Sequence, residues 1–334
     1  MSAYGSSPAV DRLAVWLGGQ VSFGQVSAVL TEVGQIHLSA SSVWRRVEQY
    51  GEQLVEGERR ATAAANAVPG RDVPQRGMVR HDQPMGIGVD GWMVHLREEG
   101  WKEVKTGVVF EVHQREITDK RTGDSVEQAT ADACSYVAQL GGPEAFGHTL
   151  WREMTERRVP EAYDKVWIGD GAPWLWNLCQ DYAPEAKQVV DWYHALSHLH
   201  AAATLIYGEQ GDRRHRWLSQ QETLLYQGHA RRIAAAIQYH ADGFSGERAE
   251  KLRAEATYFF NNQRRMRYLD YREDGWPIGS GTIEGGCKQF QTRLKGSGMR
   301  WSRSGAERML TLRAEILSGH FHQTWADLAN SPVS

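Results

Sequence analysis

Two aspartates share the same local setting, because each is flanked by glycine at the end of an apolar run. Asp90 lies in the tripeptide VDG and Asp170 in the tripeptide GDG. Cleavage and transfer of a phosphodiester use divalent cations that stabilise the attacking and leaving oxygens, and Mg²⁺ prefers a few carboxylate ligands with positions left for water and phosphate. A residue at the end of a strand holds its carboxylate in a fixed position where it can bind such a cation. A neighbouring glycine lets a substrate approach the backbone closely. Each could also be an ordinary turn aspartate, but the matching context favours a paired site.

A third acid, Glu284, lies in the segment IGSGTIEGG, in the first turn of a predicted helix. A glutamate there can serve only to compensate the helix dipole. The glycines around it clear space, however, and a basic segment begins directly after it. We therefore interpret Asp90, Asp170 and Glu284 as a catalytic, metal-ligating triad. The expected cofactor is a pair of Mg²⁺ ions, for which Mn²⁺ can substitute.

A further group of polar residues lies in the segment VVDWYHALSHLH. Asp191 and His194 mark a predicted strand-to-helix junction, and His198 lies one helical turn beyond His194. Three interpretations remain open: hydrogen bonding within the core or a helix cap, contact with phosphate, and a zinc site with Asp191 as third ligand.

Cations concentrate in residues 285–313, although the whole chain has a net charge of only −3. The segment contains a single acid, Glu307, and these cations: Lys288, Arg293, Lys295, Arg300, Arg303, Arg308 and Arg313. Such a local excess favours a polyanionic partner, although a solvated basic helix face is the alternative. We take the first five as candidate DNA contacts. Trp301, in the loop KGSGMRWSR, either stacks on an unpaired base or anchors that loop.

The N-terminal residues 1–60 show helical periodicity in three pieces. Helices are predicted near residues 11–17 and 23–33, and Ser39 or Ser41 can cap a third helix that carries Arg45 and Arg46. This outline is typical of a helix-turn-helix DNA-binding domain, with Arg45 and Arg46 as candidate contacts. Any small three-helix bundle would produce the same outline.

A stretch with alanine, proline and glycine, residues 61–83, reads as a linker. The remainder, residues 84–334, is predicted to be a mixed α/β domain with an all-helical insertion at about 195–274. The expected strands are 85–90, 93–96, 104–113, 165–168 and 188–190, and the expected helices outside the insertion are 127–140, 143–157, 173–182 and 282–294, with a last one from about 304 to 318.

The bulk composition excludes several classes of protein. The chain has 334 residues, 41% of them hydrophobic, and three isolated cysteines, which argues against a disulfide framework. It contains no long apolar run and no basic, apolar leader. We therefore expect a cytoplasmic protein that is not associated with a membrane.

Four segments together resemble a known family. The segments beginning VDGWMVHL, WIGDGAPWLWNL, VVDWYHALSHL and IGSGTIEGGCKQFQTRL look like the catalytic blocks of bacterial insertion-sequence transposases of the DDE type, in the Kra-type group, which is related to Mutator-like elements. The resemblance spans about residues 86–318. It implies an RNase H-like fold interrupted by a helical insertion, with Asp90, Asp170 and Glu284 as the three acids. Asp191 and His194 match an element that lies near the site without belonging to the triad.

The resemblance also implies the reaction and the partners. The enzyme would cleave a phosphodiester at the element's terminal repeats, and the freed 3'-hydroxyl would then attack target DNA. Such enzymes pair two ends and therefore work as homo-oligomers. Two alternatives remain: a transposase-derived DNA-binding protein that no longer transposes, and a metal-dependent nuclease.

Overall fold

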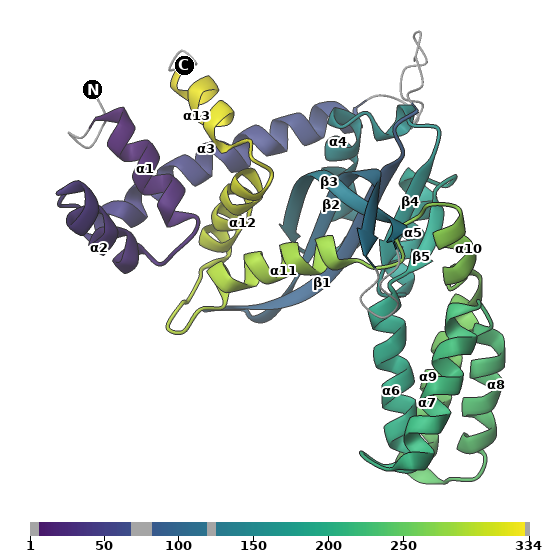
Figure 1. The fold of residues 1–334 in the computed structure, drawn as a ribbon. Helices are drawn as coiled ribbons and strands as arrows, with labels where there is room; N and C mark the ends of the chain where they lie inside the picture. The colour runs from purple at the N-terminus through teal and green to yellow at the C-terminus, as the bar shows by residue number, and fades with distance from the viewer. Residues whose placement is uncertain (1–6, 68–81, 119–124, 331–334) are drawn as a thin grey trace.

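A five-stranded mixed sheet forms the centre of the molecule (Figure 1). The computed structural model describes residues 7–67, 82–118 and 125–330. The strands are β1 Met85–Leu96, β2 Gly100–Thr118, β3 Ser125–Leu140, β4 Lys165–Gly169 and β5 Lys187–Val190, in the spatial order β3-β2-β1-β4-β5. β1, β2 and β3 pair antiparallel, whereas β4 and β5 run parallel to β1. The prediction of a mixed α/β fold is confirmed.

Helices cover both faces of this sheet. On one face lie α4 (Pro143–Glu156) and α5 (Pro173–Tyr182), and on the other lie α11 (Gly281–Leu294) and α12 (Arg303–Leu317). The packing is close at two strand glycines: a Cβ on Gly107 would lie 2.9 Å from Leu150 of α4, and one on Gly88 would lie 3.2 Å from Ile283 of α11. Glycine in β1 and β2 thus lets the helices approach the backbone.

A helical arm, residues 192–273, extends away from the sheet (Figure 1). It comprises α6 Trp192–Tyr207, α7 Asp212–Tyr226, α8 Ala230–Ala241, α9 Gly246–Asn262, the short 3₁₀ helix η2 Gln263–Arg265 and α10 Tyr268–Glu273. The chain leaves the sheet after β5 and returns beside its exit, where the Trp192 N–H donates to the Ile278 carbonyl at 2.9 Å. These helices coincide with the predicted helical insertion.

The N-terminal helices are α1 Pro8–Gly18, α2 Phe23–Gly34 and α3 Ala40–Asn66. As predicted, a serine caps α3: Ser39 Oγ accepts from the Ser42 N–H at 3.2 Å. The prediction of a linker from residue 61 is wrong at its start, because α3 continues to Asn66, whose side chain donates to the His148 carbonyl of α4 at 3.1 Å. Most of the predicted linker, residues 68–81, lies outside the described residues.

α3 also packs against α12, so the N-terminal helices are joined to the C-terminal ones. A Cβ on Gly51 would lie 2.8 Å from the Arg308 side chain, and Arg308 pairs with Glu48 at 2.6 Å. The chain continues after α12 into α13, Phe321–Asn330, which also lies beside this group (Figure 1). The N-terminal helices are therefore a packed part of the molecule.

Three predicted elements need correction. The strands expected at 85–90 and 93–96 are one strand, β1, because it pairs with β2 along its whole length. The helix expected at 127–140 is β3, a long strand paired with β2. Its alanines favour a helix locally, but the ladder with β2 overrides that preference. The register shifts near Ala133, whose left-handed φ of 47° marks a β-bulge.

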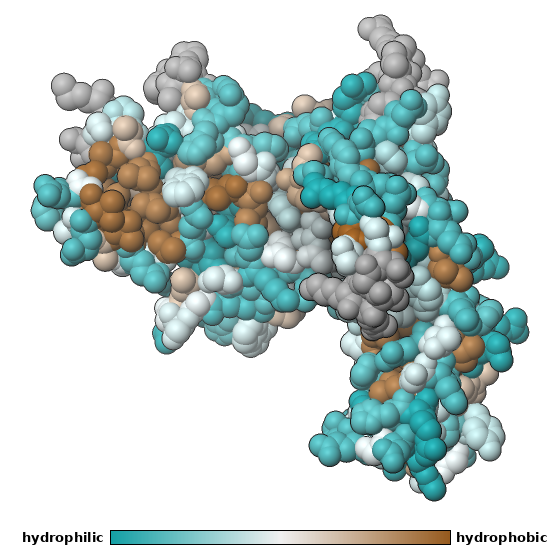
Figure 2. Space-filling view, viewed as in Figure 1, coloured by the Kyte–Doolittle hydropathy of each residue, from teal (hydrophilic) through white to brown (hydrophobic). Residues whose placement is uncertain are grey.

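The surface over α1 and α2 is apolar (Figure 2). Exposed apolar side chains of these two helices include Leu13, Val29 and Val33, the last of them 83% exposed. No helix in the described part of the chain is both long and apolar enough to cross a bilayer.

The N-terminal helices supply a first test, because two adjacent arginines have opposite environments. Arg46 is buried and pairs with Asp11 at 2.6 Å, whereas Arg45 is exposed. Arg46→Ala leaves a buried carboxylate without this partner, so we expect a loss of about 3–5 kcal/mol in the free energy of unfolding by urea denaturation. Arg45→Ala is the matched control and should change it by less than about 0.5 kcal/mol. Equal effects of the two substitutions would contradict this assignment.

Candidate functional site

Asp90 and Asp170 lie at the same level of two neighbouring parallel strands. The Cα pairing of β1 with β4 joins Gly88 to Ile168, and the aspartates follow these residues by two positions on each chain. The predicted setting at a strand end is right for Asp170, which follows β4 directly. It is wrong for Asp90, which lies inside β1 because β1 continues beside β2 after β4 has ended.

Burial and the charge of Asp170 both act on the Asp90 carboxylate. Burial raises the pKa of Asp90, and the nearby Asp170 carboxylate raises it further, against the lowering effect of the Gly91 N–H. That N–H donates to Asp90 Oδ1 at 2.7 Å. Two like charges held close together in a partly buried site disfavour the doubly ionised state, so this pair is a place where a cation would be stabilised.

The backbone turn after Asp170 is held by the helical arm. Asp170 Oδ1 accepts from the Ala172 N–H at 2.8 Å, and Gly171 adopts a φ of 102° that favours glycine. Tyr258 of α9 donates its hydroxyl to the Asp170 carbonyl at 2.8 Å. Burial raises the pKa of Tyr258, and the charge of Asp170 adds to this effect, so the hydroxyl stays protonated as a donor.

A second layer fixes Tyr258 in place. Its ring stacks on His198 with the centroids 3.6 Å apart, and His198 Nδ1 lies 2.7 Å from Glu255 Oε2. Sequence analysis did not find Tyr258, because it lies far from Asp170 along the chain and no spacing links them. Tyr258 reaches Asp170 only because α9 of the helical arm returns to the sheet beside the end of β4.

Asp191 occupies the corresponding level on β5 and has a structural role. It is almost fully buried and caps α6, with Oδ1 accepting from the His194 N–H at 2.7 Å. Its Oδ2 accepts from the Ser280 N–H, on the segment that leads into α11. The cap interpretation is therefore the one that the contacts support. His194 lies near enough to Asp90 for its charge to lower the pKa of that carboxyl, although less than burial raises it.

Glu284 lies on the first turn of α11, above the sheet face that carries Asp90. Cys287, one turn further on, contacts one of the acids: its thiol donates to the Asp90 carboxylate. Burial raises the pKa of Cys287, and both Asp90 and Glu284 raise it further. The Glu284 side chain itself is exposed and pairs with Lys288 at 2.6 Å.

The three predicted ligands are thus neighbours but do not converge. Among the described residues, no group of three or more His, Cys, Asp or Glu side chains is arranged to hold a metal ion. Asp90 and Asp170 follow paired residues of β1 and β4, whereas Glu284 is turned towards Lys288. The zinc interpretation finds no support in these contacts, because the Asp191 oxygens accept backbone N–H groups and His198 faces Glu255.

Most cations of the basic segment are engaged within the protein. Arg293 is buried and donates to the Gly18 carbonyl at 2.8 Å, and burial lowers its pKa to about 10. Arg303 pairs with Glu99 at 2.6 Å. Lys295 and Arg300 are exposed and, within residues 7–67, 82–118 and 125–330, have no ion pair. The interpretation of Arg293 as a DNA contact is therefore not supported.

Trp301 anchors its loop. It is 7% exposed, donates its indole N–H to the Leu294 carbonyl at 2.9 Å, and forms a bridge with Leu96 of β1. Of the two interpretations of this residue, base stacking is not supported, because the ring is enclosed.

No protein-family model matches the chain, and no curated protein matches it either.

Asp191 supplies a second test. Asp191→Ala removes the cap of α6 and leaves the Ser280 N–H without its acceptor, so we expect a loss of about 2–4 kcal/mol in the free energy of unfolding. Asp191→Asn keeps one acceptor oxygen and should lose roughly half as much. If Asp191 were a zinc ligand instead, the wild-type melting temperature would fall on adding a chelator, and we expect no such fall.

Asp90 supplies a third test, which concerns pH. Its pKa is raised in the folded state, so its contribution to stability is complete below the unfolded value of about 3.9 and is lost as pH rises through the folded value. Asp90→Asn should therefore be more stable than the wild type at pH 7, by about 0.5–2 kcal/mol in urea denaturation, and the difference should vanish below about pH 4.

The control for this test is Asp164→Asn, which removes an exposed carboxylate just before the opposite end of β4. It should change stability by less than about 0.5 kcal/mol at either pH. An Asp90→Asn variant that is less stable than the wild type at pH 7 would contradict the assigned repulsion.

Proposed function

We propose that the chain is a DDE-type transposase that cleaves and joins DNA at Asp90, Asp170 and Glu284. The observation that carries this proposal is the position of Asp90 and Asp170 at one level of adjacent parallel strands, where the charge of Asp170 helps burial to raise the pKa of Asp90. Metal-dependent phosphodiester chemistry needs such a pair, because the charge of a divalent cation offsets the repulsion.

The proposed fold of the catalytic part is RNase H-like. Support comes from the order β3-β2-β1-β4-β5, with three antiparallel strands followed by two parallel ones. Further support comes from the helical arm, which is inserted between β5 and the helix that carries Glu284. Both features agree with what the four sequence segments imply.

Glu284 is proposed as the third ligand. Its ion pair with Lys288 is exposed at both ends, and exposed pairs of this kind contribute only about 0–1 kcal/mol, so a cation can replace Lys288 as its partner. Two Mg²⁺ or Mn²⁺ ions bound there would stabilise charge on the attacking and leaving oxygens. The protein's own contribution is to hold Asp90 through Gly91 and Asp170 through Ala172.

DNA contacts are proposed for the cations that remain exposed. After the end of α11 these are Lys295 and Arg300, which have no ion pair among the described residues, and Arg303, which is exposed but paired with Glu99. On α11 itself, Lys288 joins them once Glu284 turns to a cation. At the other end of the molecule, Arg45 lies exposed on the first turns of α3, where the reading helix of a helix-turn-helix domain contacts bases. Binding of terminal repeats by α1 to α3 is proposed on this ground.

A homo-oligomer is proposed because two DNA ends must be paired. The apolar surface over α1 and α2 supports it (Figure 2), since exposed apolar patches mark interaction sites. Reaction with chromosomal DNA would take place in the bacterial cytoplasm. The two alternatives, a DNA-binding protein without transposition and a metal-dependent nuclease, are separated by the experiment that follows.

The test compares two substitutions at opposite ends of β4. Asp170→Asn should lower Mg²⁺-dependent cleavage of a plasmid that carries the DNA flanking the coding sequence by at least about 100-fold, because a lost ligand removes several kcal/mol of charge stabilisation. Asp164→Asn should cleave at the wild-type rate. Mg²⁺ should also raise the melting temperature of the wild type more than that of Asp170→Asn.

The outcomes separate the three functions. Cleavage confined to the flanking DNA supports a transposase, equal cleavage of a plasmid without it indicates a nuclease, and binding without any cleavage indicates a DNA-binding protein. Full cleavage by Asp170→Asn would overturn the proposed triad.

A further inference from the structure

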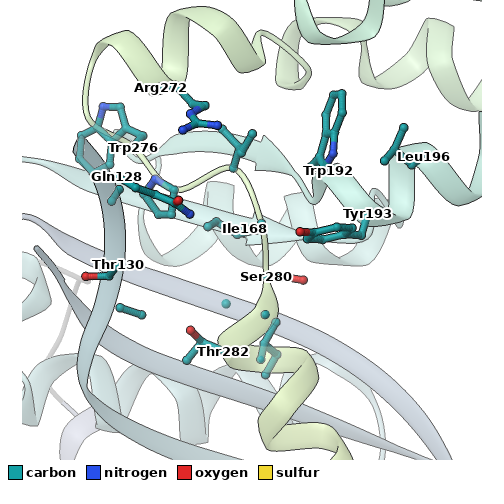
Figure 3. Close-up of a pocket in the computed structure, with 18 of the residues that line it drawn as sticks. Gln128, Thr130, Ile168, Trp192, Tyr193, Leu196, Arg272, Trp276, Ser280 and Thr282 are labelled. Atoms are coloured by element: carbon teal, nitrogen blue, oxygen red, sulfur yellow. The ribbon is translucent and has the colours of Figure 1, made fainter. Parts of the chain in front are cut away.

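A cavity of about 990 Å³ lies between the sheet, the base of the helical arm and the segment that leads into α11. This volume falls in the range of about 300–1,000 Å³ that holds small organic ligands. Figure 3 shows the rings of Trp192, Tyr193 and Trp276 around it, with Ile168 between them. Neither the predicted triad nor the predicted DNA contacts use this cavity.

The cavity lies directly beside the acids. Its lining includes Gly88 and Ile168, which precede Asp90 and Asp170 by two residues each. Two residues of a strand span about 7 Å and return to the same face, so Gly88 and Asp90 lie on one side of β1. A DNA strand whose phosphodiester lies at the acids would therefore bring its next nucleotide to the cavity.

Several features of the lining suit a planar, neutral group. The rings offer surfaces for stacking, and Gln128, Thr130 and Thr282 offer groups that can hydrogen-bond to the edge of such a group. The charged residues of the lining are Glu127, Glu222 and Arg272. Because two of these residues are acidic and one is basic, the net negative charge of the lining disfavours a phosphate inside the cavity. The sugar-phosphate backbone would therefore remain outside.

The walls are held in place before any ligand binds. Trp192 makes edge contacts with Tyr268 at 4.8 Å and with Tyr226 at 5.9 Å between ring centroids. Tyr193 is 65% exposed, and its ring lies beside Gly279, where a Cβ would be 3.5 Å away. Tyr193 thus has ring surface left for a partner, whereas Trp192 forms a rigid wall.

We propose that this cavity accepts one unpaired nucleobase of the DNA strand whose phosphodiester lies at Asp90 and Asp170. The inference rests on the proposed function and extends it by naming a base-binding subsite. Taking a base out of the stack requires an aromatic pocket with polar groups at its edge, and the cavity supplies both. The site would accept different bases, since stacking is tolerant of sequence.

The experiment measures binding without cleavage, in EDTA. The probes are a fluorescein-labelled dT12 strand and a strand of equal length and charge in which every base is replaced by hydrogen. The wild type should bind dT12 about 5- to 100-fold more tightly than the abasic strand, the factor expected for one stacked base. Tyr193→Ala and Trp276→Ala should bring this ratio close to one, with little change in the affinity for the abasic strand.

The matched control is Tyr239→Ala, which removes an exposed ring from α8 of the same arm and should keep the wild-type ratio. Circular dichroism checks the folding of each variant. Tyr193 decides the test if Trp276→Ala does not fold, because an exposed ring can be removed with little effect on stability. Equal binding of the two strands by the wild type, or an unchanged ratio in Tyr193→Ala, would overturn the proposal.

The two proposals can fail separately. If the protein prefers bases in a way that depends on Tyr193 but does not cleave DNA, the base-binding subsite is supported and the transposase proposal is refuted. If cleavage depends on Asp170 but the protein shows no base preference, only the base-binding subsite is refuted.

Discussion

The arrangement of the site depends on one buried carboxylate, that of Asp191. Its two oxygens accept N–H groups from two segments, the first turn of α6 and the residues before α11. Close to Asp191, the Trp192 N–H donates to the Ile278 carbonyl and joins the same two segments. Because the end of β5, the first turn of α6 and the segment before α11 meet here, α11 begins at a fixed place on the sheet, and Glu284 and Cys287 come to lie near Asp90. A charge buried this deeply is stable only when its hydrogen bonds are satisfied, and here backbone donors satisfy them.

The parts of the site that could be predicted are those governed by strand periodicity. Asp90 and Asp170 follow apolar runs, and parallel strands carry such residues to one edge, so their proximity follows from the sequence. The strand β3 could not be predicted in the same way, because its alanines match helical preferences and only the long ladder with β2 decides its conformation. Tyr258 was beyond prediction for a related reason, since its contact with Asp170 exists only once the arm has folded back.

Counting cations along the chain overestimated the surface available for DNA. Arg293 faces inward and joins α11 to the end of α1, and Arg308 joins α12 to α3. A planar guanidinium can satisfy several carbonyl or carboxylate groups at once, which suits it to holding helices together. The cations whose pattern indicates a polyanionic partner therefore include those that hold the N-terminal helices against α11 and α12. Only burial and partners distinguish the two roles, and among the described residues Lys295, Arg300 and Arg45 are exposed without an ion pair, whereas Lys288 and Arg303 are exposed within one.

The helical arm leaves and rejoins the sheet at neighbouring residues, and this has a consequence for how the protein can change over evolution. A segment attached at one point can lengthen, shorten or be exchanged at its far end without altering the strands that carry the acids. The near end has no such freedom, because Tyr258 and Asn262 hold the turn at Asp170 and Gly171. Related chains should therefore diverge most at the distal turns, around Gly208 and Gly243, while the last turns of α9 keep their sequence. The arm is in this sense a module with one variable end and one end that is fixed by its contacts with the turn after β4.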